Sequence, residues 1–476
     1  MSLTLVSDTL PLNLGIISFK VAISSVQLTS KSGVQSTLNL GGLNAGKGLI
    51  VDLARAQSDS VFLGTVSGVP EGTDNNTTVT VGLTGAQLTF FNGTGAAITN
   101  LTPQCPVNTV CSITFNVSGT PVITFSQVIS GNTGIGIDFN LKNAITLTGT
   151  TLAVNLTNPG TNDVFSAFGL PRTNSGLSAG QLDRIEDFTG LATVTGTSVT
   201  ITSGPQAGRG SITALSGSNT VFDPDPTGQL CSGKTSPLSC LTTANEAASM
   251  DAILNSDGTF TIQELEPLHA TPVVDTVEGT VVSIGTNGTQ FSIITSDIIA
   301  AATNTKIASL NMGDPLTVNL SASVATGGFL VDTKGLPVGG ALGNFAGGTT
   351  TAVLHLGQSV AVHVVNFTAA NGTTAAIANN VDLVTLRWSR FIATVKNAGN
   401  PLFGVTNLPG YFGFPSASVF DVQTFIGPDG VSNLDGFLSN TSNLSPASPV
   451  AIRALFLEDS GSTLDPAFFA TKVRER

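Results

Sequence analysis

The sequence is poor in charged residues and in the polar aromatic residues that often line binding sites. Charged side chains make up 10% of its 476 residues, with one Trp, one Tyr and three His. An average soluble protein carries about 25% charged residues. The 18 Lys and Arg are outnumbered by 30 Asp and Glu, giving a net charge of −12. No basic stripe is present to neutralise phosphates, which argues against a nucleic-acid partner.

Long apolar runs are also missing. No stretch reaches the roughly 18–20 apolar residues that a transmembrane helix needs. Residues 1–14 (MSLTLVSDTLPLNL) lack the basic start and the continuous apolar core of an export signal. We therefore expect no transmembrane segment, and we expect an exported form to have lost its signal.

The four cysteines fall into two local pairs, Cys105 with Cys111 and Cys231 with Cys240. Zinc sites use a tighter Cys spacing and partner histidines, neither of which is present. We predict two loop-closing disulfides. Disulfides persist in oxidising compartments, so this interpretation places the chain outside the cytoplasm, either extracellular or at the cell surface.

What the chain has in abundance indicates an all-β fold. It contains 53 Gly and 41% hydrophobic residues, enough to build cores, and it is rich in Thr, Ser, Asn and Val. This is the composition of many short strands joined by Gly, Asn and Ser turns. The length suggests several domains.

A hairpin signal recurs along the second half of the chain. Residues 276–294 (TVEGTVVSIGTNGTQFSII) alternate apolar and polar residues on both sides of Asn287-Gly288, a strong hairpin signal. Related patterns occur at 187–201 and 390–405. Apolar residues also alternate in the part of the chain before the repeats, as at Phe19, Val21 and Ile23. Short alternating strands of this kind are typical of a β-sandwich. We predict a β-sandwich followed by about three small β-barrel-like domains; the predicted ranges are 1–185, 186–272, 273–387 (with a Gly-rich insert) and 388–476 (a divergent repeat).

Several segments resemble a known family. SFKVAISSVQLTS, SVFLGTVSGVP and GIGIDFNLKNAI are similar to an N-terminal domain of unknown function in secreted bacterial cell-envelope lipoproteins. EGTVVSI…TQFSI and LGQSVAVHV…GTTAAIANNV resemble the small-barrel domain that often follows it. The resemblance implies an exported β-protein and assigns no activity. The family's export signal and lipid-attachment cysteine have no counterpart here.

No motif indicates catalysis, a cofactor or a metal site. His269, His355 and His363 have no Asp-rich surroundings. Glu264 and Glu266 share one face of a predicted strand, which we interpret as a solvated face. The charged segment 182–187 (LDRIED) is interpreted as a solvated linker. We predict no catalytic residue, no cofactor and no metal.

One local aromatic cluster, Tyr411, Phe412 and Phe414, lies in a Pro- and Gly-containing loop. Exposed rings of this kind stack on sugars, so the loop is a candidate contact surface. The alternative is that the rings pack inside their own domain.

These observations predict a non-enzymatic structural or interaction protein of the cell exterior. Low charge suits subunits that pack side by side, since few charges are desolvated at a contact. Self-assembly into a filament or surface layer is the sharper form of this hypothesis, with the chain itself as partner. The alternative is an adhesion module that binds glycans or other surface polymers through the Tyr411 loop.

Overall fold

The computed structural model describes most of the chain. The described residues are 1–8, 10, 15–43, 46–69, 76–93, 98–101, 104–115, 117, 122–126, 134–157, 163–170, 185–202, 211–218, 220–222, 237–241, 246–255, 259–267, 275–300, 305–325, 328–333, 336, 338, 345–372, 374–425, 433–435, 440–457 and 467–475. Strands dominate these residues, so the all-β prediction is confirmed. Two compact units are present, 1–222 with 248–265, and 223–247 with 266–476.

Helices are few and short in the described part of the chain. The α-helix there is α1 (Leu141–Ala144). The 3-10 helices are η2 (Arg55–Gln57), η4 (Pro237–Cys240), η5 (Ala322–Ala325), η7 (Thr351–Val353), η8 (Gly410–Phe412) and η9 (Thr441–Asn443).

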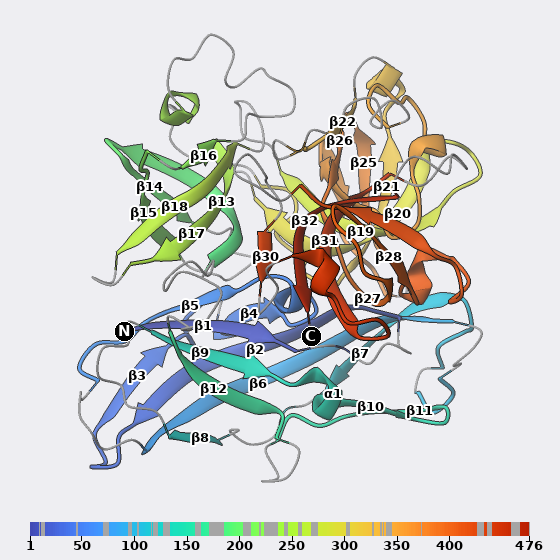
Figure 1. Cartoon of the computed structure of the whole chain (residues 1–476). Helices are drawn as coiled ribbons and strands as arrows, with labels where there is room; N and C mark the ends of the chain where they lie inside the picture. The colour runs from blue at the N-terminus through green and yellow to red at the C-terminus, as the bar shows by residue number, and fades with distance from the viewer. Residues whose placement is uncertain are drawn as a thin grey trace. The chain divides into compact units, whose positions relative to one another are not determined.

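Two sheets and a hairpin form within residues 1–170 (Figure 1). The first sheet runs in the order β12 (Phe165–Leu170), β9 (Gly134–Phe139), β1 (Ser2–Ser7), β5 (Val61–Thr65). The second runs β3 (Gln35–Asn39), β2 (Gly15–Thr29), β6 (Asn76–Asn92), β7 (Thr109–Phe115), with β4 (Leu49–Asp52) on β2 and β8 (Val122–Ser126) on β6. The hairpin consists of β10 (Ile145–Thr148) and β11 (Thr151–Val154).

The period of two in the sequence determines which side chains these sheets bury. In β2, Phe19, Val21 and Ile23 are fully buried, as their alternation predicts. Strand β1 pairs parallel with β9 and antiparallel with β5, so it lies inside its sheet, with Leu3 and Leu5 buried. The chain passes repeatedly between the two sheets, which is the connectivity of a β-sandwich.

The next sheet closes on itself. Its strands are β13 (Ile185–Thr195), β14 (Ser198–Thr202), β15 (Ser211–Leu215), β17 (Glu246–Leu254), β18 (Phe260–Pro267) and β16 (Val221–Phe222). Their order is β15-β14-β13-β17-β18, and a parallel pairing of β15 with β18 completes a five-stranded ring, with β16 added to β18. Val199, Ile201 and Ile212 fill its interior.

The start of this sheet corrects one expectation from the sequence. The charged segment 182–187 was interpreted as a solvated linker, yet Glu186 lies in β13 and is 1% exposed. Its Oε2 accepts a 2.6 Å hydrogen bond from the backbone N–H of Ser60. A buried carboxylate is tolerated where it accepts such hydrogen bonds. The other part of the predicted linker, residues 182–184, lies outside the described residues.

Residues 276–387 form an eight-stranded sheet. Its order is β22 (Phe329–Val331), β26 (Val384–Arg387), β23 (Ser359–His363), β19 (Thr276–Ile284), β20 (Gln290–Ile299), β21 (Pro315–Leu320), β25 (Ala376–Val381), β24 (Asn366–Thr368). The predicted hairpin is confirmed as β19 and β20, with Ile284 opposite Phe291. Gly288 takes φ +75° at the turn, a conformation that favours glycine.

Residues 389–475 form the last sheet. Its order is β29 (Phe420–Gln423), β28 (Leu402–Thr406), β27 (Ser389–Asn397), β31 (Pro449–Phe456), β32 (Phe468–Glu475), β30 (Asn433–Asp435). A parallel pairing of β29 with β32 closes a five-stranded ring.

The last three sheets share one topology. With the added strands β16, β22, β24 and β30 left out, and β25 with β26 taken as one, each sheet has five strands in chain order. The first strand pairs with the second and the fourth, and the third pairs parallel with the fifth. In the eight-stranded sheet the fifth strand is interrupted at Asp382 and Leu383, so β25 contacts β21 while β26 contacts β23. A closed five-stranded β-barrel is also the architecture of OB-folds. We call these sheets barrels 1, 2 and 3; the predicted domain boundaries themselves stay predictions.

Candidate functional site: a buried arginine cluster

The most unusual chemistry of the described residues surrounds Arg387, the last residue of β26. Strand β22 runs parallel to β26, which brings the following residue, Asp332, beside it: the Asp332 N–H donates to the carbonyl of Leu386. Glu278 lies on β19, two strands away across β23. Glu266 is the penultimate residue of β18. Three carboxylates therefore converge on one guanidinium.

The contacts form a connected network. Arg387 Nη1 donates to Glu266 Oε1 and to Asp332 Oδ2, and Arg387 Nε lies 3.5 Å from Glu278 Oε2. Arg390, on β27, places its Nη1 3.5 Å from the other oxygen of Glu278.

Two neutral residues also bind this cluster. The indole Nε1–H of Trp388 donates to Asp332 Oδ2 over 3.2 Å, and Ser359 Oγ donates to Glu278 Oε1 over 3.3 Å. Hydrogen-bond donors of this kind compensate part of the desolvation of a buried carboxylate.

Water has almost no access to these charges. The side chains of Arg387, Glu266 and Asp332 are 5%, 1% and 2% exposed, and those of Glu278 and Arg390 are 10% and 9% exposed. Burial alone would lower the pKa of Arg387. The charges of Glu266, Asp332 and Glu278 outweigh it, and together they raise the Arg387 pKa well above its usual value.

This electrostatic arrangement favours a structural role. A guanidinium has five N–H donors and no acceptor, and Arg387 holds its proton under all ordinary conditions, so it cannot exchange protons with a substrate. The cluster instead joins Glu266 to β19, β22, β26 and β27 through charged hydrogen bonds, which are the stronger kind.

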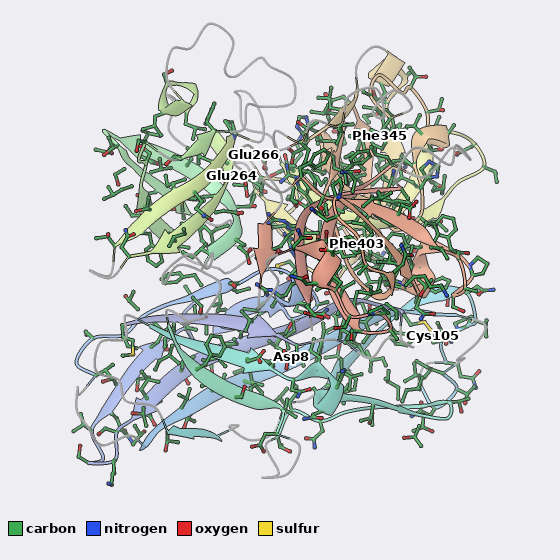
Figure 2. The ribbon with its side chains drawn as sticks, in the orientation of Figure 1. Asp8, Cys105, Glu264, Glu266, Phe345 and Phe403 are labelled. Carbon is green, nitrogen blue, oxygen red and sulfur yellow. A yellow bond between two sulfur atoms is a disulfide. The ribbon has the colours of Figure 1, made fainter. Side chains whose placement is uncertain are left out.

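The sequence interpretation missed this cluster. Glu266 was assigned to a solvated face together with Glu264, and that assignment is wrong for Glu266, which is buried (Figure 2 labels both residues on β18). The available signal was Arg387 itself, in TLRW at the end of an apolar strand. An arginine in such a run requires acidic partners.

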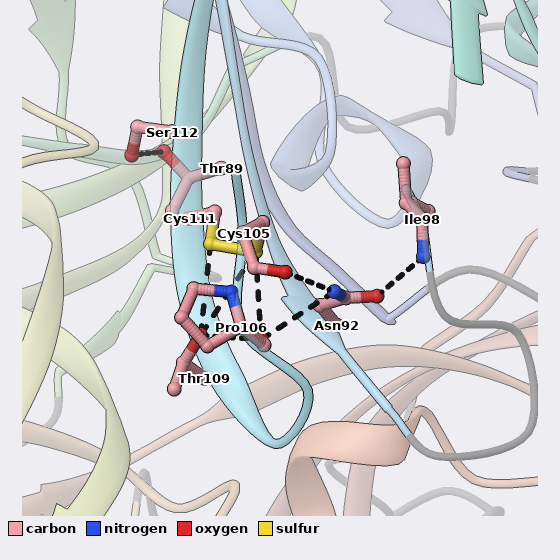
Figure 3. The surroundings of a disulfide bond; sticks show 8 residues. All are labelled: Thr89, Asn92, Ile98, Cys105, Pro106, Thr109, Cys111 and Ser112. Carbon is pink, nitrogen blue, oxygen red and sulfur yellow. Dashed lines mark hydrogen bonds between the residues drawn. A yellow bond between two sulfur atoms is a disulfide. The ribbon is translucent and has the colours of Figure 1, made fainter. Parts of the chain in front are cut away.

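The first predicted disulfide is present. Cys105 and Cys111 are bonded, with 5.9 Å between their Cα atoms (Figure 3). Cys111 lies on β7 opposite Phe90 of β6, so the bond fastens the loop before β7 to the sheet. The second predicted pair stays a prediction, because Cys231 lies outside the described residues.

Asn92, the last residue of β6, holds the same loop through its amide. Its Nδ2 donates to the carbonyl of Cys105 over 2.8 Å, and its Oδ1 accepts from the N–H of Ile98 over 2.8 Å (Figure 3). Asn92 is 1% exposed. Its amide therefore serves loop packing, although Asn92-Gly-Thr reads as a glycosylation triplet.

The aromatic loop of barrel 3 is buried to a large extent. Tyr411 and Phe412 lie in η8 and are 5% and 3% exposed. Phe412 packs against Phe391 and Phe456, with ring centroids 5.3 Å and 5.4 Å apart. This burial favours the packing interpretation of the loop over a contact surface; Phe414 is half-buried.

The histidines do not assemble a site in the described part. His269 lies outside it. His355 packs near the ring of Phe456, and His363 is buried on β23, with Nδ1 3.7 Å from Asp382 Oδ1. Among the described residues, no group of three or more His, Cys, Asp or Glu could hold a metal ion.

Comparisons with protein-family models and with curated proteins return no match for this chain. The resemblance to cell-envelope lipoproteins therefore stays a prediction. Among the described residues no helix is long and apolar enough to cross a membrane.

Proposed function

We propose that this chain is a non-enzymatic structural protein of the cell exterior, in which fused barrels form a stiff element that assembles with further copies of itself. The observation that carries the proposal is the junction between barrels 2 and 3. Strand β26 ends at Arg387 and β27 begins at Ser389, so only Trp388 separates two sheets. A flexible linker would instead be several polar, Gly- or Ser-rich residues long.

Side-chain contacts fasten this junction from both sides. Ser389 Oγ donates to the carbonyl of Gly357 over 2.9 Å and accepts from the N–H of Ser359 over 3.0 Å. Gln358 Nε2 donates to the carbonyl of Phe456 over 2.9 Å.

The apolar core is continuous across the junction as well. One buried cluster contains residues of barrel 2 together with Leu455 and Phe469 of barrel 3, and Trp388 lies within it at 1% exposure. The buried charges around Arg387, the indole of Trp388 and the shared apolar core all lie at this junction. They leave barrels 2 and 3 little freedom to bend relative to each other, and a structural element requires such stiffness.

The Cys105–Cys111 disulfide supports the extracellular part of the proposal, because such bonds persist in oxidising compartments. Neutral polar outer faces support the self-assembly part. On β14 and β15, for example, the side chains of Thr200 and Thr213 form a hydrogen bond of 2.8 Å with each other. Few charges would need to be desolvated when faces of this kind pack together in an assembly.

Solution size and shape test the proposal. We expect sedimentation and negative-stain microscopy of the purified chain under native, non-reducing conditions to show concentration-dependent assemblies. Dispersed monomers at high concentration would contradict self-assembly. Cleavage by a nonspecific protease between residues 387 and 389 under native conditions would contradict the stiff junction.

The glycan-binding alternative was tied to the Tyr411 loop. Burial of Tyr411 and Phe412 removes the exposed rings on which that version depended.

A further inference from the structure

A row of amide side chains crosses the outward face of barrel 2. Gln290 on β20, Asn319 on β21 and Asn379 on β25 lie on three neighbouring strands. Gln290 Nε2 donates to Asn319 Oδ1 over 2.9 Å, and Asn319 Nδ2 donates to Asn379 Oδ1 over 2.7 Å. Asn366, on the edge strand β24, is the register partner of Asn379.

The row points outward because its sequence neighbours fill the core. Phe291, Val318 and Ala378 alternate with the amides and are 1%, 0% and 0% exposed. The three amides themselves are half-buried, and Asn366 is exposed.

The two hydrogen bonds within the row leave much of its capacity unused. Each amide offers two N–H donors and an oxygen with two lone pairs. The row uses one N–H of Gln290 and one of Asn319, so every amide retains a donor and an acceptor. The hydrogen bonds also hold the amides in fixed orientations, which lowers the entropy cost of binding a ligand.

The outward-facing positions of β20, β21 and β25 carry no charged side chain. The row's outward neighbours on the same three strands include Ser292, Thr317 and Ile377, all half-buried. A phosphate-bearing or otherwise anionic ligand would find no cation on these strands, and a hydrophobic one would find little apolar surface. Paired donors and acceptors on a neutral face match the hydroxyl groups of a sugar.

The position of the row within the barrel is a second, independent observation. Strands β20 and β21 are the second and third strands of barrel 2, and OB-folds bind oligonucleotides and oligosaccharides on the face of their strands 2 and 3. Oligonucleotides need Lys or Arg for affinity, and none lies among these outward positions. With strands about 4.8 Å apart, the row spans about 10 Å from β20 to β25, which favours an extended chain over a single sugar.

We infer that the amide row of β20, β21 and β25 is a binding face for a neutral polysaccharide. This binding is separate from self-assembly and does not depend on it. It also differs from the adhesion hypothesis based on Tyr411, since it lies on another barrel and uses hydrogen bonds rather than stacked rings.

The test uses the full chain and three neutral polysaccharides, namely cellulose, chitin and soluble dextran, with alginate as an anionic comparison. We expect retention on at least one neutral polymer. That retention should survive an increase in salt from about 0.05 to about 0.5 M, because it involves no ion pairs. Asn319→Ala, which removes both hydrogen bonds of the row, should weaken binding about tenfold.

Two further variants keep the inference open to contradiction. Thr317→Arg leaves the amides in place but sets a long cation beside them, and it should also weaken binding. Gln27→Val is the matched control, because Gln27 donates to Gln35 and Thr37 on an exposed face of the second sheet, far from barrel 2 in sequence; it should bind as the unmodified chain does. Melting curves establish that each variant is folded.

Four results would overturn the inference. They are no retention on any neutral polymer, retention on alginate alone, binding by Asn319→Ala and Thr317→Arg as strong as that of the unmodified chain, or a loss of binding with Gln27→Val as large as theirs. If Thr317→Arg changed sedimentation in the absence of polysaccharide, the face would be a contact between copies of the chain instead. Failure of self-assembly with binding intact would contradict the proposed function and leave this inference standing.

Discussion

Replacing Arg387 by Met is the sharpest test of the buried cluster. At about 4 Å and an effective dielectric constant of about 20, each ion pair is worth about 4 kcal/mol before desolvation is subtracted. Arg387 contacts three carboxylates, all at most 10% exposed. Removing it leaves those acids buried beside one another without the guanidinium that they share. Loss of one partner from a buried ionic group typically costs about 3–5 kcal/mol, and we expect Arg387→Met to lower the free energy of unfolding by that amount.

The measurement is chemical unfolding followed by circular dichroism, with calorimetry as a second probe. Lys396→Met is the matched control, because Lys396 lies exposed on β27 and loses the same charge; its expected effect is within about 0.5 kcal/mol. A variant that adds Glu266→Gln and Asp332→Asn to Arg387→Met should regain part of the loss, since fewer unpaired charges remain buried. Arg387→Met costing no more than Lys396→Met would refute the reasoning.

The direction of the Arg387 pKa shift adds a pH dependence. Its folded-state pKa lies above the ordinary value, so the stabilisation it provides is fully present below the ordinary arginine pKa. That stabilisation is lost only as pH rises through the still higher folded-state pKa. The stability difference between the unmodified chain and Arg387→Met should therefore not shrink between neutral and moderately alkaline pH. Shrinkage over that range would mean that the cluster opens.

Three further variants probe the other contacts. The double variant Cys105→Ser with Cys111→Ser should lose about 2–3 kcal/mol of free energy of unfolding, measured by chemical unfolding. Reduction of the unmodified chain by dithiothreitol should cause the same loss, and no change on reduction would count against the bond. Asn92→Ala should cost about 1–3 kcal/mol by the same measurement, because it leaves buried backbone groups unpaired, whereas a neutral effect would show that the loop does not need the amide. Gly357→Ala should lower the melting temperature in calorimetry, since Gly357 has φ +88° and an added Cβ would lie 2.3 Å from the ring of Phe412; unchanged melting would contradict the tight junction.

Local patterns predicted well what local physics determines. The turn at Asn287-Gly288 produced the β19–β20 hairpin because alternation and turn geometry act within a few residues. The Cys105–Cys111 bond was predictable because its two cysteines are only six positions apart in the sequence. Alternation likewise identified the buried positions of β2.

Long-range contacts were beyond such patterns. Glu266 and Arg387 are 121 positions apart in the sequence, and alternation places a residue on a face without telling whether another sheet covers that face. Glu186 was misjudged for the same reason, since its partner is Ser60. The amide row also went unnoticed, because Gln290 and Asn319 become neighbours only through strand register.

The junction residue Trp388 is the sole tryptophan of the chain. It is 1% exposed, and its indole N–H donates a hydrogen bond to the carboxylate of Asp332. Fluorescence excited at the red edge of the tryptophan absorption band therefore comes from this one indole. Emission therefore reports whether barrels 2 and 3 are in contact, while circular dichroism reports the strands of the whole chain. An emission change that precedes the loss of strand signal would show that the junction parts before either barrel melts. The molecule thus carries its own optical probe for the joint on which its stiffness depends.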